Sequence, residues 1–367
     1  MIGQLGLGGA EKQLVLLARG LSDRGVRTHL LVMFEKGARE KELEGSGVRL
    51  VELGFTRRTG KGAWWSSRAN LRAFGRLVAF LRAERPQVLQ AFLFHSYVLA
   101  APAARLARVP VLLAGRRSLG FYKAGNTLAL AVERIATRWT DFLVANAAAI
   151  ADEVRREERV PAAKISVIPN GMRPEEFRIA EPAAVDTALP VVLCVANLAA
   201  HKGHRHLLDA CAALRQAGTP CTLVLIGEGP EGAELRRTAR RLDLDVRFLG
   251  ARTDVSGYLA RADAVVLPSL SEGSSNAVAE AMAAGRPVVA TAVGGTPELL
   301  GDRGVLVPPA DPAALAEALG RVLGDPDAAA ALGRSARAWA LANLTADVMV
   351  DRYLALYRRL LAERGRR

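Results

Sequence analysis

The stretch "ADAVVLPSLSEGSSNAVAEAMAAGRPVVAT", residues 262–291, decides the fold class of this chain. An apolar, strand-forming run opens it, and a second apolar run at 287–291 closes it. Between them, Ser274 or Ser275 can cap a helix that ends at Gly285. The order strand, helix, strand predicts a parallel α/β unit. The N-terminus of its helix then lies at the carboxyl end of the first strand, where it can bind an anion.

The same alternation of strands and helices extends over most of the chain, with one interruption. The polar, proline-containing stretch at 178–190 predicts a linker. Helices fit between the strands, for example at Glu11–Ser22, where apolar residues recur on one face. The expected strands are 29–34, 87–92, 109–115, 141–146 and the start of 165–177 before the linker, then 191–197, 221–229, 246–250, 262–269, 287–291 and 304–308. Two Rossmann-like α/β domains with a cleft between them are the simplest architecture.

The chain begins "MIGQLGLGGAEKQL", a glycine-rich turn that opens a helix. In this class of fold such a turn follows the first β-strand, and it lets the backbone approach a phosphate closely. We see no strand before the turn. Two explanations remain open: the start was assigned too late, which we favour, or the first strand is reduced to a stub.

The positive charge is concentrated in the first half of the chain. Residues 1–180 hold 29 Lys and Arg against 16 Asp and Glu, whereas residues 181–367 hold 21 of each kind. Between Phe55 and Lys123 there are 13 basic residues and a single acid, Glu84. This distribution predicts contact with phosphates of a membrane surface, an anionic substrate or a nucleic acid. A general bias toward arginine does not explain why the second half is neutral.

The composition favours a reducing, cytoplasmic location. The three cysteines, Cys194, Cys211 and Cys221, lack the spacing of a disulfide framework. No secretory leader is recognisable, and the longest uncharged stretch, 86–104, contains two prolines, so that any membrane contact would be peripheral.

The tryptophans and arginines of residues 57–86 suggest how such a contact could form. Trp64 and Trp65, with arginines at 57, 58, 68, 72, 76 and 82, resemble a surface helix that rests on anionic lipid at the inner face of the membrane. An ordinary amphipathic helix packed on the sheet is the alternative.

Three side chains in the second half fit a site for a phosphorylated sugar. Glu272 lies at the turn after a strand, where a carboxylate can accept hydrogen bonds from sugar hydroxyls, and Glu280 follows about two helical turns later, suitable for a ribose diol. Lys202, at another turn from strand to helix, is a point charge suitable for a diphosphate. Two solvated surface acids are the alternative for the glutamates. No acid or cysteine near the histidines at 201, 204 and 206 completes a metal site, and we expect no metal.

Over nearly its whole length the chain resembles a retaining glycosyltransferase of family 4, which has the GT-B fold. Glu272 and Glu280 match the family's E-x7-E motif. The other stretches that carry the resemblance, in order, are "GLGGAEKQL", "VIPNGMRPEEF", "VANLAAHKG", "LIGEGPEGAELRRTARRLDLDVRFLG", "ADAVVLPSLSEGSSNAVAEAMAAGRPVVAT" and "VGGTPELL". The order and spacing of these stretches are more specific than any one of them.

The resemblance implies a metal-independent transfer from a nucleotide diphosphate sugar, with no cofactor, to a glycan, a lipid-linked intermediate or another cell-envelope acceptor. It implies an acceptor-binding domain at 1–180, a donor-binding domain at 181–344, and a final helix at 345–367 that returns to the first domain.

The resemblance also assigns roles to residues. Glu280 is expected to bind the ribose, Glu272 the donor sugar near its reacting carbon, and Lys202 the diphosphate, whose departing charge it would help to carry. Gly9 would approach that diphosphate from the first domain. Other expected donor contacts are the backbone around Ser275, Asn276 and Ala277, and, beside the base, the segment 248–252.

The chain departs from the family pattern at several places. A usual arginine falls at Asn197, so one cation for the diphosphate is missing, and Arg205 or an arginine of the first domain is expected to replace it. The family's H-x-H pattern falls on Gln90 and Phe92, leaving His95 as acceptor-site residue or helix cap. A further histidine is replaced by "GRRSLGF", where Arg116 and Arg117 could clamp a diphosphate or an anionic acceptor. Because the leaving phosphate can take the acceptor's proton, losing a histidine does not exclude activity.

The sequence is less consistent with three other functions. A nucleotide-sugar epimerase of similar architecture predicts clustered acids and histidines, in which the cleft-facing turns are poor. A basic, non-catalytic protein that binds lipid or nucleic acid remains an alternative, but the sequence has no stacking surface or basic recognition helix, and we expect no nucleic-acid partner. An NAD-dependent oxidoreductase would need the pattern G-x-G-x-x-G, which "GLGGAE" does not supply.

Overall fold

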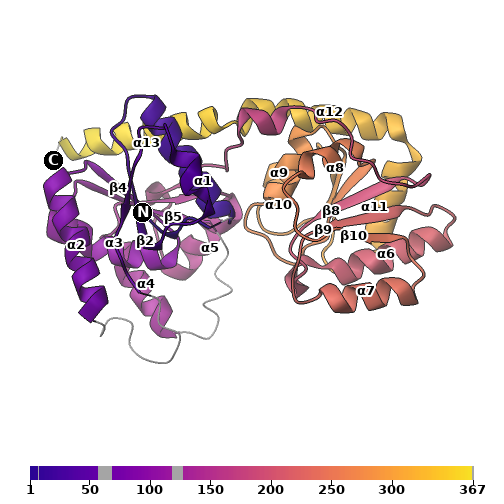
Figure 1. Cartoon of the computed structure of the whole chain (residues 1–367), viewed down its shortest axis with the longest axis horizontal. Helices are drawn as coiled ribbons and strands as arrows, with labels where there is room; N and C mark the ends of the chain where they lie inside the picture. Colours follow the sequence, from indigo (N-terminus) through magenta and orange to yellow (C-terminus); the bar gives the residue numbers. More distant parts are fainter. Residues whose placement is uncertain (7, 57–67, 118–126, 366–367) are drawn as a thin grey trace. The chain divides into compact units, whose positions relative to one another are not determined.

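The computed structural model describes residues 1–6, 8–56, 68–117 and 127–365 (Figure 1). The chain divides into two compact units, which we call unit 1, Met1–Gly171 with Ala346–Arg367, and unit 2, Met172–Thr345. The first boundary therefore lies at 171/172, and the expectation of 180/181 is wrong. The reason is packing: the Met172 N–H donates to the carbonyl of Leu344 at 2.7 Å, and Met172 and Phe177 are buried in the core of unit 2.

Within its described residues, unit 1 contains seven parallel strands in two hydrogen-bonded sheets, ordered β1-β2-β3 and β4-β5-β6-β7. The strands are β1 Ile2–Gln4, β2 His29–Glu35, β3 Arg49–Glu52, β4 Val88–Phe92, β5 Val111–Arg116, β6 Phe142–Ala145 and β7 Ile165–Val167. β1 lies next to β4, because the Phe92 N–H donates to the carbonyl of Met1 at 2.9 Å. The chain thus builds outward in one direction from β1 and in the other from β4.

Helices cover both faces of the strands of unit 1. They are α1 Gly9–Asp23, α2 Arg68–Glu84, α3 Phe94–Ala107, α4 Thr127–Trp139, α5 Ala148–Glu158 and α13 Ala346–Gly365. Alternate strand residues divide between two cores, because successive side chains of a strand point to opposite faces. Leu89 and Leu112 pack with α2, α3 and α5, whereas Val111 and Leu113 pack with α1 and α13. The final helix, α13, packs against α1 within unit 1.

Unit 2 holds a six-stranded parallel sheet in the order β10-β9-β8-β11-β12-β13. The strands are β8 Val191–Val195, β9 Thr222–Ile226, β10 Val246–Phe248, β11 Ala264–Leu267, β12 Val288–Thr291 and β13 Val305–Val307. The strand order reverses between β8 and β11. In open parallel sheets ligands bind outside the carboxyl ends of the strands at such a reversal.

The helices of unit 2 also form a layer on each face of the sheet (Figure 1). Residues of α6 His204–Gln216, α7 Gly232–Arg241 and α11 Pro312–Gly324 bury one face, and residues of α8 Val255–Arg261, α9 Asn276–Ala283, α10 Thr296–Leu300 and α12 Pro326–Asn343 bury the other. Val192 and Leu193, successive in β8, point into the first and the second core respectively. This period of two explains why the strands read as continuous apolar runs.

The strands expected from the sequence are present, but two short ones were missed. β1 has three residues and is paired with β2, so a short strand does precede the glycine turn, which agrees with the alternative of a strand reduced to a stub. β3 has four residues, of which none is buried. Both are too short, and β3 too polar, to give the apolar run by which the other strands were recognised.

Within the described ranges, none of the helices combines the length and the apolar character that a bilayer-crossing segment needs. All three cysteines are free and buried.

Candidate active site

Glu272 is held in the turn that follows β11. Its carboxylate accepts a hydrogen bond from the Ser269 hydroxyl at 2.7 Å, and its side chain is 8% exposed. The hydroxyl of Thr291, at the end of β12, donates to the carbonyl of Ser269 at 2.5 Å and so ties the turn to the neighbouring strand. A buried carboxylate is stable only with such partners.

Lys202 supplies the charge that balances this carboxylate. It ends a short 3-10 helix, Ala200–Lys202, after β8, and its Nζ lies 2.6 Å from Oε1 of Glu272. The Lys202 side chain is 20% exposed, so the pair is shielded from water but can be reached from solvent. The sequence placed both residues at carboxyl ends of strands, and the structure brings them into direct contact across the reversal between β8 and β11.

Glycines allow the loops of this edge to meet. Gly203 has φ +70°, and a Cβ there would lie 2.0 Å from the carbonyl oxygen of Pro268. Gly294, after β12, has φ +55°, and its Cβ would lie 1.7 Å from the carbonyl oxygen of Glu272. Neither position tolerates a side chain, and both hold the backbone around the Lys202–Glu272 pair.

The first turn of α9 completes the site. Ser275 is its N-cap, and the Ser275 hydroxyl accepts a hydrogen bond from the N–H of Val278 at 3.3 Å, which confirms the predicted cap. Asn276 and Ala277 open the helix, so that their backbone N–H groups lie in the turn that has no intrahelical acceptors. Glu280 is on the same helix and half-buried. These residues can offer hydrogen bonds to a phosphate and a carboxylate to a diol.

Arg205 is engaged elsewhere. On α6 it pairs with Glu231, at 3.0 Å between nitrogen and oxygen, and its side chain is 62% exposed. An exposed ion pair of this kind contributes little, so a phosphate can compete with Glu231 for the guanidinium. The role of Arg205 toward a diphosphate stays a prediction.

The neighbouring histidines do not form a cluster of ligands. His204 is buried with its Nε2 3.8 Å from the Cys194 sulfur, and burial lowers the pKa of His204 to about 4. At neutral pH it is therefore an uncharged residue of the core. In the described part of the chain, no group of three or more His, Cys, Asp or Glu is arranged to hold a metal ion.

In unit 1 two candidates lie where the strand order reverses. Gly9 is the first residue of α1, after β1, and His95 is the second residue of α3, after β4. His95 is exposed and makes edge-to-face ring contacts with Phe34 and Phe94. It is therefore open to an acceptor, and its role stays a prediction.

The two adjacent arginines of unit 1 have different environments. Arg117 donates to the side-chain oxygen of Asn170 at 2.5 Å and to the hydroxyl of Tyr353, on α13, at 3.0 Å. It is half-buried and remains a candidate for an anion.

Arg116, by contrast, points into the interior. Its side chain is 5% exposed, pairs with Glu158 at 2.9 Å and lies over the ring of Tyr97. This position does not suit a phosphate, and the proposed role of Arg116 as a clamp is corrected to a structural one. Successive residues of a strand face opposite sides, which separates Arg116 from its neighbour.

The same interior holds a carboxyl group that stays protonated. Glu133, fully buried, has a carboxyl oxygen 3.8 Å from Arg116, and burial, with the nearby carboxylate of Glu158, raises the pKa of Glu133 to about 9. In the unfolded chain the carboxyl group of Glu133 ionises near its ordinary pKa of 4.5. Between these two pH values the unfolded state has lost a proton that the folded state keeps, so stability falls as pH rises.

We expect Glu133→Gln to remove this pH dependence. The free energy of unfolding of the variant, relative to wild type, should rise from pH 5 to pH 8 by no more than about 1.4 kcal/mol per pH unit. Chemical denaturation at several pH values measures it, with the exposed Glu317→Gln on α11 of unit 2 as control. Parallel curves for wild type and Glu133→Gln would contradict the assignment.

Comparison with known proteins agrees with this architecture. A family model described as "Glycosyltransferase Family 4" matches residues 7–176, and one described as "Glycosyl transferases group 1" matches residues 189–325. The 2-deoxystreptamine glucosyltransferase of Streptomyces kanamyceticus is 29% identical over 389 residues, covering 96% of this chain and 99% of that protein. A glycogen synthase of Mycobacterium tuberculosis is 33% identical over 301 residues, covering 78% of this chain and 71% of that protein.

Among solved structures, Anabaena HepE in complex with UDP superimposes with a TM-score of 0.81 at 23% identity. The match covers 98% of this chain and 99% of HepE, so the likeness in fold extends over both units. This likeness in fold, taken with the strand orders and the two family matches, identifies the chain as a member of the family 4 glycosyltransferases, group 1, with the GT-B fold.

Proposed function

We propose that the protein transfers a sugar from a nucleoside diphosphate sugar to a glycan, lipid-linked or other cell-envelope acceptor, with retention of the anomeric configuration. The observation that carries the proposal is the Lys202–Glu272 pair at the strand reversal of unit 2, beside the first turn of α9. HepE was solved with UDP and with UDP-glucose, and this supports a uridine nucleotide as the first donor to test.

In the proposed reaction the bond between the anomeric carbon and the diphosphate oxygen breaks, and the acceptor oxygen bonds to the same face of the sugar. Lys202 stabilises the negative charge on the departing diphosphate, with the N–H groups of the first turn of α9. Glu272 accepts hydrogen bonds from the donor sugar, and Glu280 from the ribose. The leaving phosphate takes the acceptor's proton, so no residue of the protein has to act as base and no metal is required.

In this proposal the Glu272 carboxylate has partners both before and after the donor binds. Before donor binds, Lys202 neutralises Glu272 at 2.6 Å. When a diphosphate arrives, the ammonium group gains a second anionic partner, while Ser269 continues to donate to the Glu272 carboxylate. The buried carboxylate therefore keeps its hydrogen-bond partner when the donor binds.

The donor assignment predicts a thermal shift that depends on Glu280. At a concentration of 100 times Kd, the matching UDP-, GDP-, ADP- or dTDP-sugar should stabilise the wild type by about 2.7 kcal/mol in the presence of EDTA. Glu280→Ala should abolish most of this shift, because the ribose loses its carboxylate partner.

The control for that experiment is Glu317→Ala, which removes an exposed glutamate from the surface of α11. It should keep the whole shift. If folded wild-type protein responds to none of the sugars, or if Glu280→Ala responds as wild type does, the proposed donor site is wrong.

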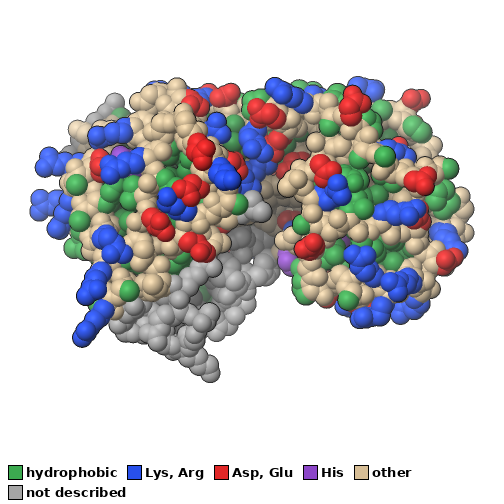
Figure 2. Space-filling model, in the orientation of Figure 1, with side chains coloured by type: hydrophobic (Ala, Val, Ile, Leu, Met, Phe, Trp, Pro, Cys, Tyr) green, Lys and Arg blue, Asp and Glu red, His purple; other side chains and the backbone are tan. Residues whose placement is uncertain are grey.

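For the acceptor side, we propose that this protein is cytoplasmic and contacts an anionic membrane through residues 57–86. Residues 57–67, with Trp64 and Trp65, lie outside the described residues. On α2, Arg68, Arg72 and Arg82 are exposed, and Figure 2 has basic side chains along the edge that α2 forms. Cosedimentation with vesicles tests the membrane contact. We expect the protein to bind vesicles that contain anionic lipid, and equal binding to neutral vesicles would contradict the proposal.

A further inference from the structure

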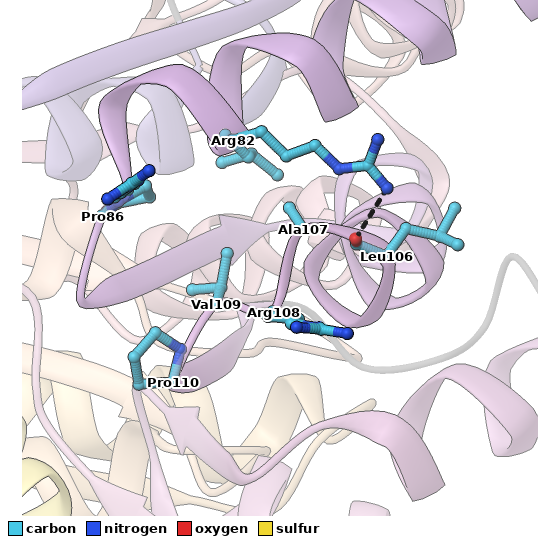
Figure 3. Close-up of a pocket in the computed structure, with 9 residues that line it drawn as sticks. Arg82, Pro86, Leu106, Ala107, Arg108, Val109 and Pro110 are labelled. Atoms are coloured by element: carbon cyan, nitrogen blue, oxygen red, sulfur yellow. Dashed lines mark hydrogen bonds between the residues drawn. The ribbon is translucent and has the colours of Figure 1, made fainter.

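Unit 1 carries a surface cavity of about 610 Å³ at the edge of the sheet opposite Gly9 and His95 (Figure 3). The cavity lies where α2 and α3 end and the chain re-enters the sheet. Pro86 precedes β4, and Pro110 precedes β5. Because Gly9 and His95 follow the carboxyl ends of their strands, the cavity at the amino ends is a separate place in unit 1.

The charged groups of the cavity are all positive. Arg82, Arg85 and Arg108 line it, and the described residues that line it include no aspartate or glutamate. The guanidinium group of Arg82 is oriented by a hydrogen bond to the carbonyl of Leu106 at 3.1 Å (Figure 3). That bond uses one N–H of the five that an arginine carries, so donors remain for a ligand.

The helix ends reduce this charge but do not cancel it. α2 and α3 both point their C-terminal ends at the cavity, and each end is equivalent to roughly half a negative charge. Three guanidinium groups against two such ends leave a net positive charge of about two. Planar guanidinium groups bind phosphate oxygens in pairs of parallel hydrogen bonds.

The backbone at two of the arginines is unusual. Arg85 has φ 47° and Arg108 φ 56°, and both follow the last turn of a helix, where glycine or asparagine is the common choice. Arg159, after α5, has φ 55° and lines no part of the cavity. An arginine in this conformation can therefore act only as a cation at the C-terminal end of its helix, without binding a ligand. Arg85 and Arg108 differ from Arg159 because both line the same cavity as Arg82.

We propose that this cavity binds a phosphate-bearing ligand, separately from the donor. A soluble phosphate monoester and the headgroup of an anionic phospholipid share the phosphate oxygens that the guanidinium groups lining this cavity can bind. The amphipathic rim, with Leu106 53% exposed, accommodates either of them. The site would hold the protein to a phosphorylated partner without taking part in sugar transfer.

The left-handed backbone provides a clean test. Asparagine adopts this conformation readily, so Arg85→Asn/Arg108→Asn removes two charges without backbone strain. Arg159→Asn makes the same change at the end of α5 and is the matched control. Titration with glycerol 3-phosphate measures binding of a soluble monoester. Cosedimentation with phosphatidylglycerol vesicles, compared with phosphatidylcholine vesicles, measures binding of a lipid headgroup.

We expect the double variant to lose about 30-fold in affinity in at least one of the two assays, and Arg159→Asn to lose none. A loss with glycerol 3-phosphate identifies a soluble ligand, and a loss with phosphatidylglycerol alone identifies a lipid. Wild-type binding to neither probe, or equal binding by the double variant and the control, would overturn the proposal. The thermal shift with donor sugar should be unchanged in the double variant, which separates this site from the proposed donor site.

Discussion

Replacing Lys202 with alanine is expected to lower kcat/KM for sugar transfer roughly 100- to 1,000-fold, the cost of removing one preorganised donor to a developing negative charge. In the proposed reaction that charge develops on the departing diphosphate. Lys202 is only 20% exposed, so few water molecules can replace its ammonium group. The fall should lie mainly in kcat, because the charge is greater in the transition state than in the bound donor.

The substitution has a second consequence, at Glu272. Without Lys202, the carboxylate keeps the Ser269 hydroxyl but loses its ion-pair partner at 2.6 Å. A largely buried carboxylate without a balancing cation is destabilising, and the turn after β11 should become less rigid. Lys202→Arg keeps the charge and should recover part of the activity, although the larger planar group fits a different geometry.

A control variant tests whether the effect depends on the position of Lys202 or follows from the loss of any positive charge in unit 2. Arg237→Ala removes a cation of unit 2 whose partner, Glu234, lies on the same exposed surface of α7. Its kcat/KM should equal that of wild type. Steady-state kinetics with the donor found by thermal shift measures all three variants. A Lys202→Ala enzyme that retains kcat/KM within about threefold of wild type would exclude the proposed role.

The sequence predicted the location of this site better than its construction. Strand-ending turns could be recognised from apolar runs, so Lys202 and Glu272 were both placed at carboxyl ends of strands. Their contact depends on β8 and β11 being neighbours, which follows from the strand order and not from either motif. Gly294 was missed because it acts on Glu272 through a tertiary contact, and Ser269 was missed although it lies only three residues before Glu272, in the same turn.

The error over Arg116 has a different cause. Two adjacent arginines in "GRRSLGF" look equivalent in a sequence, but β5 ends at the first of them and turns its side chain inward. The carboxylate that receives Arg116 belongs to Glu158, on α5, 42 residues along the chain. A buried ion pair between elements that are distant in sequence leaves no local sequence pattern. The sequence also does not distinguish an arginine on the surface from a buried one. The domain boundary was misplaced for a similar reason, since Met172 belongs to unit 2 through its hydrogen bond to Leu344.

The largest expected effect on stability comes from Gly294→Ala. A methyl group at this position would lie 1.7 Å from the carbonyl oxygen of Glu272, and the backbone angle of φ +55° is one that alanine adopts poorly. Because the atom in conflict belongs to the backbone, the turn of residues 272–273 or the loop after β12 must move. We expect a loss of roughly 3 kcal/mol or more in the free energy of unfolding, since strain and displacement add.

The matched control for Gly294 is Gly218→Ala. Gly218 has φ +79°, and a Cβ there meets nothing within 4 Å, so the control measures the conformational cost alone, roughly 1 to 2 kcal/mol. Gly294→Ala should therefore melt at a lower temperature than Gly218→Ala, by about 2–4 °C for each additional kcal/mol.

The same pair of variants tests whether the loop after β12 positions the donor site. In Gly294→Ala the displaced backbone carries Glu272 away from Lys202, and the stabilisation by donor sugar should be lost even at temperatures where the variant is folded. Gly218→Ala, in the turn between α6 and β9, should keep it. Equal melting temperatures for the two variants would show that the loop yields to the methyl group at no cost. Full donor stabilisation of Gly294→Ala would show that Glu272 does not depend on Gly294, and the loop after β12 would then have no part in the site.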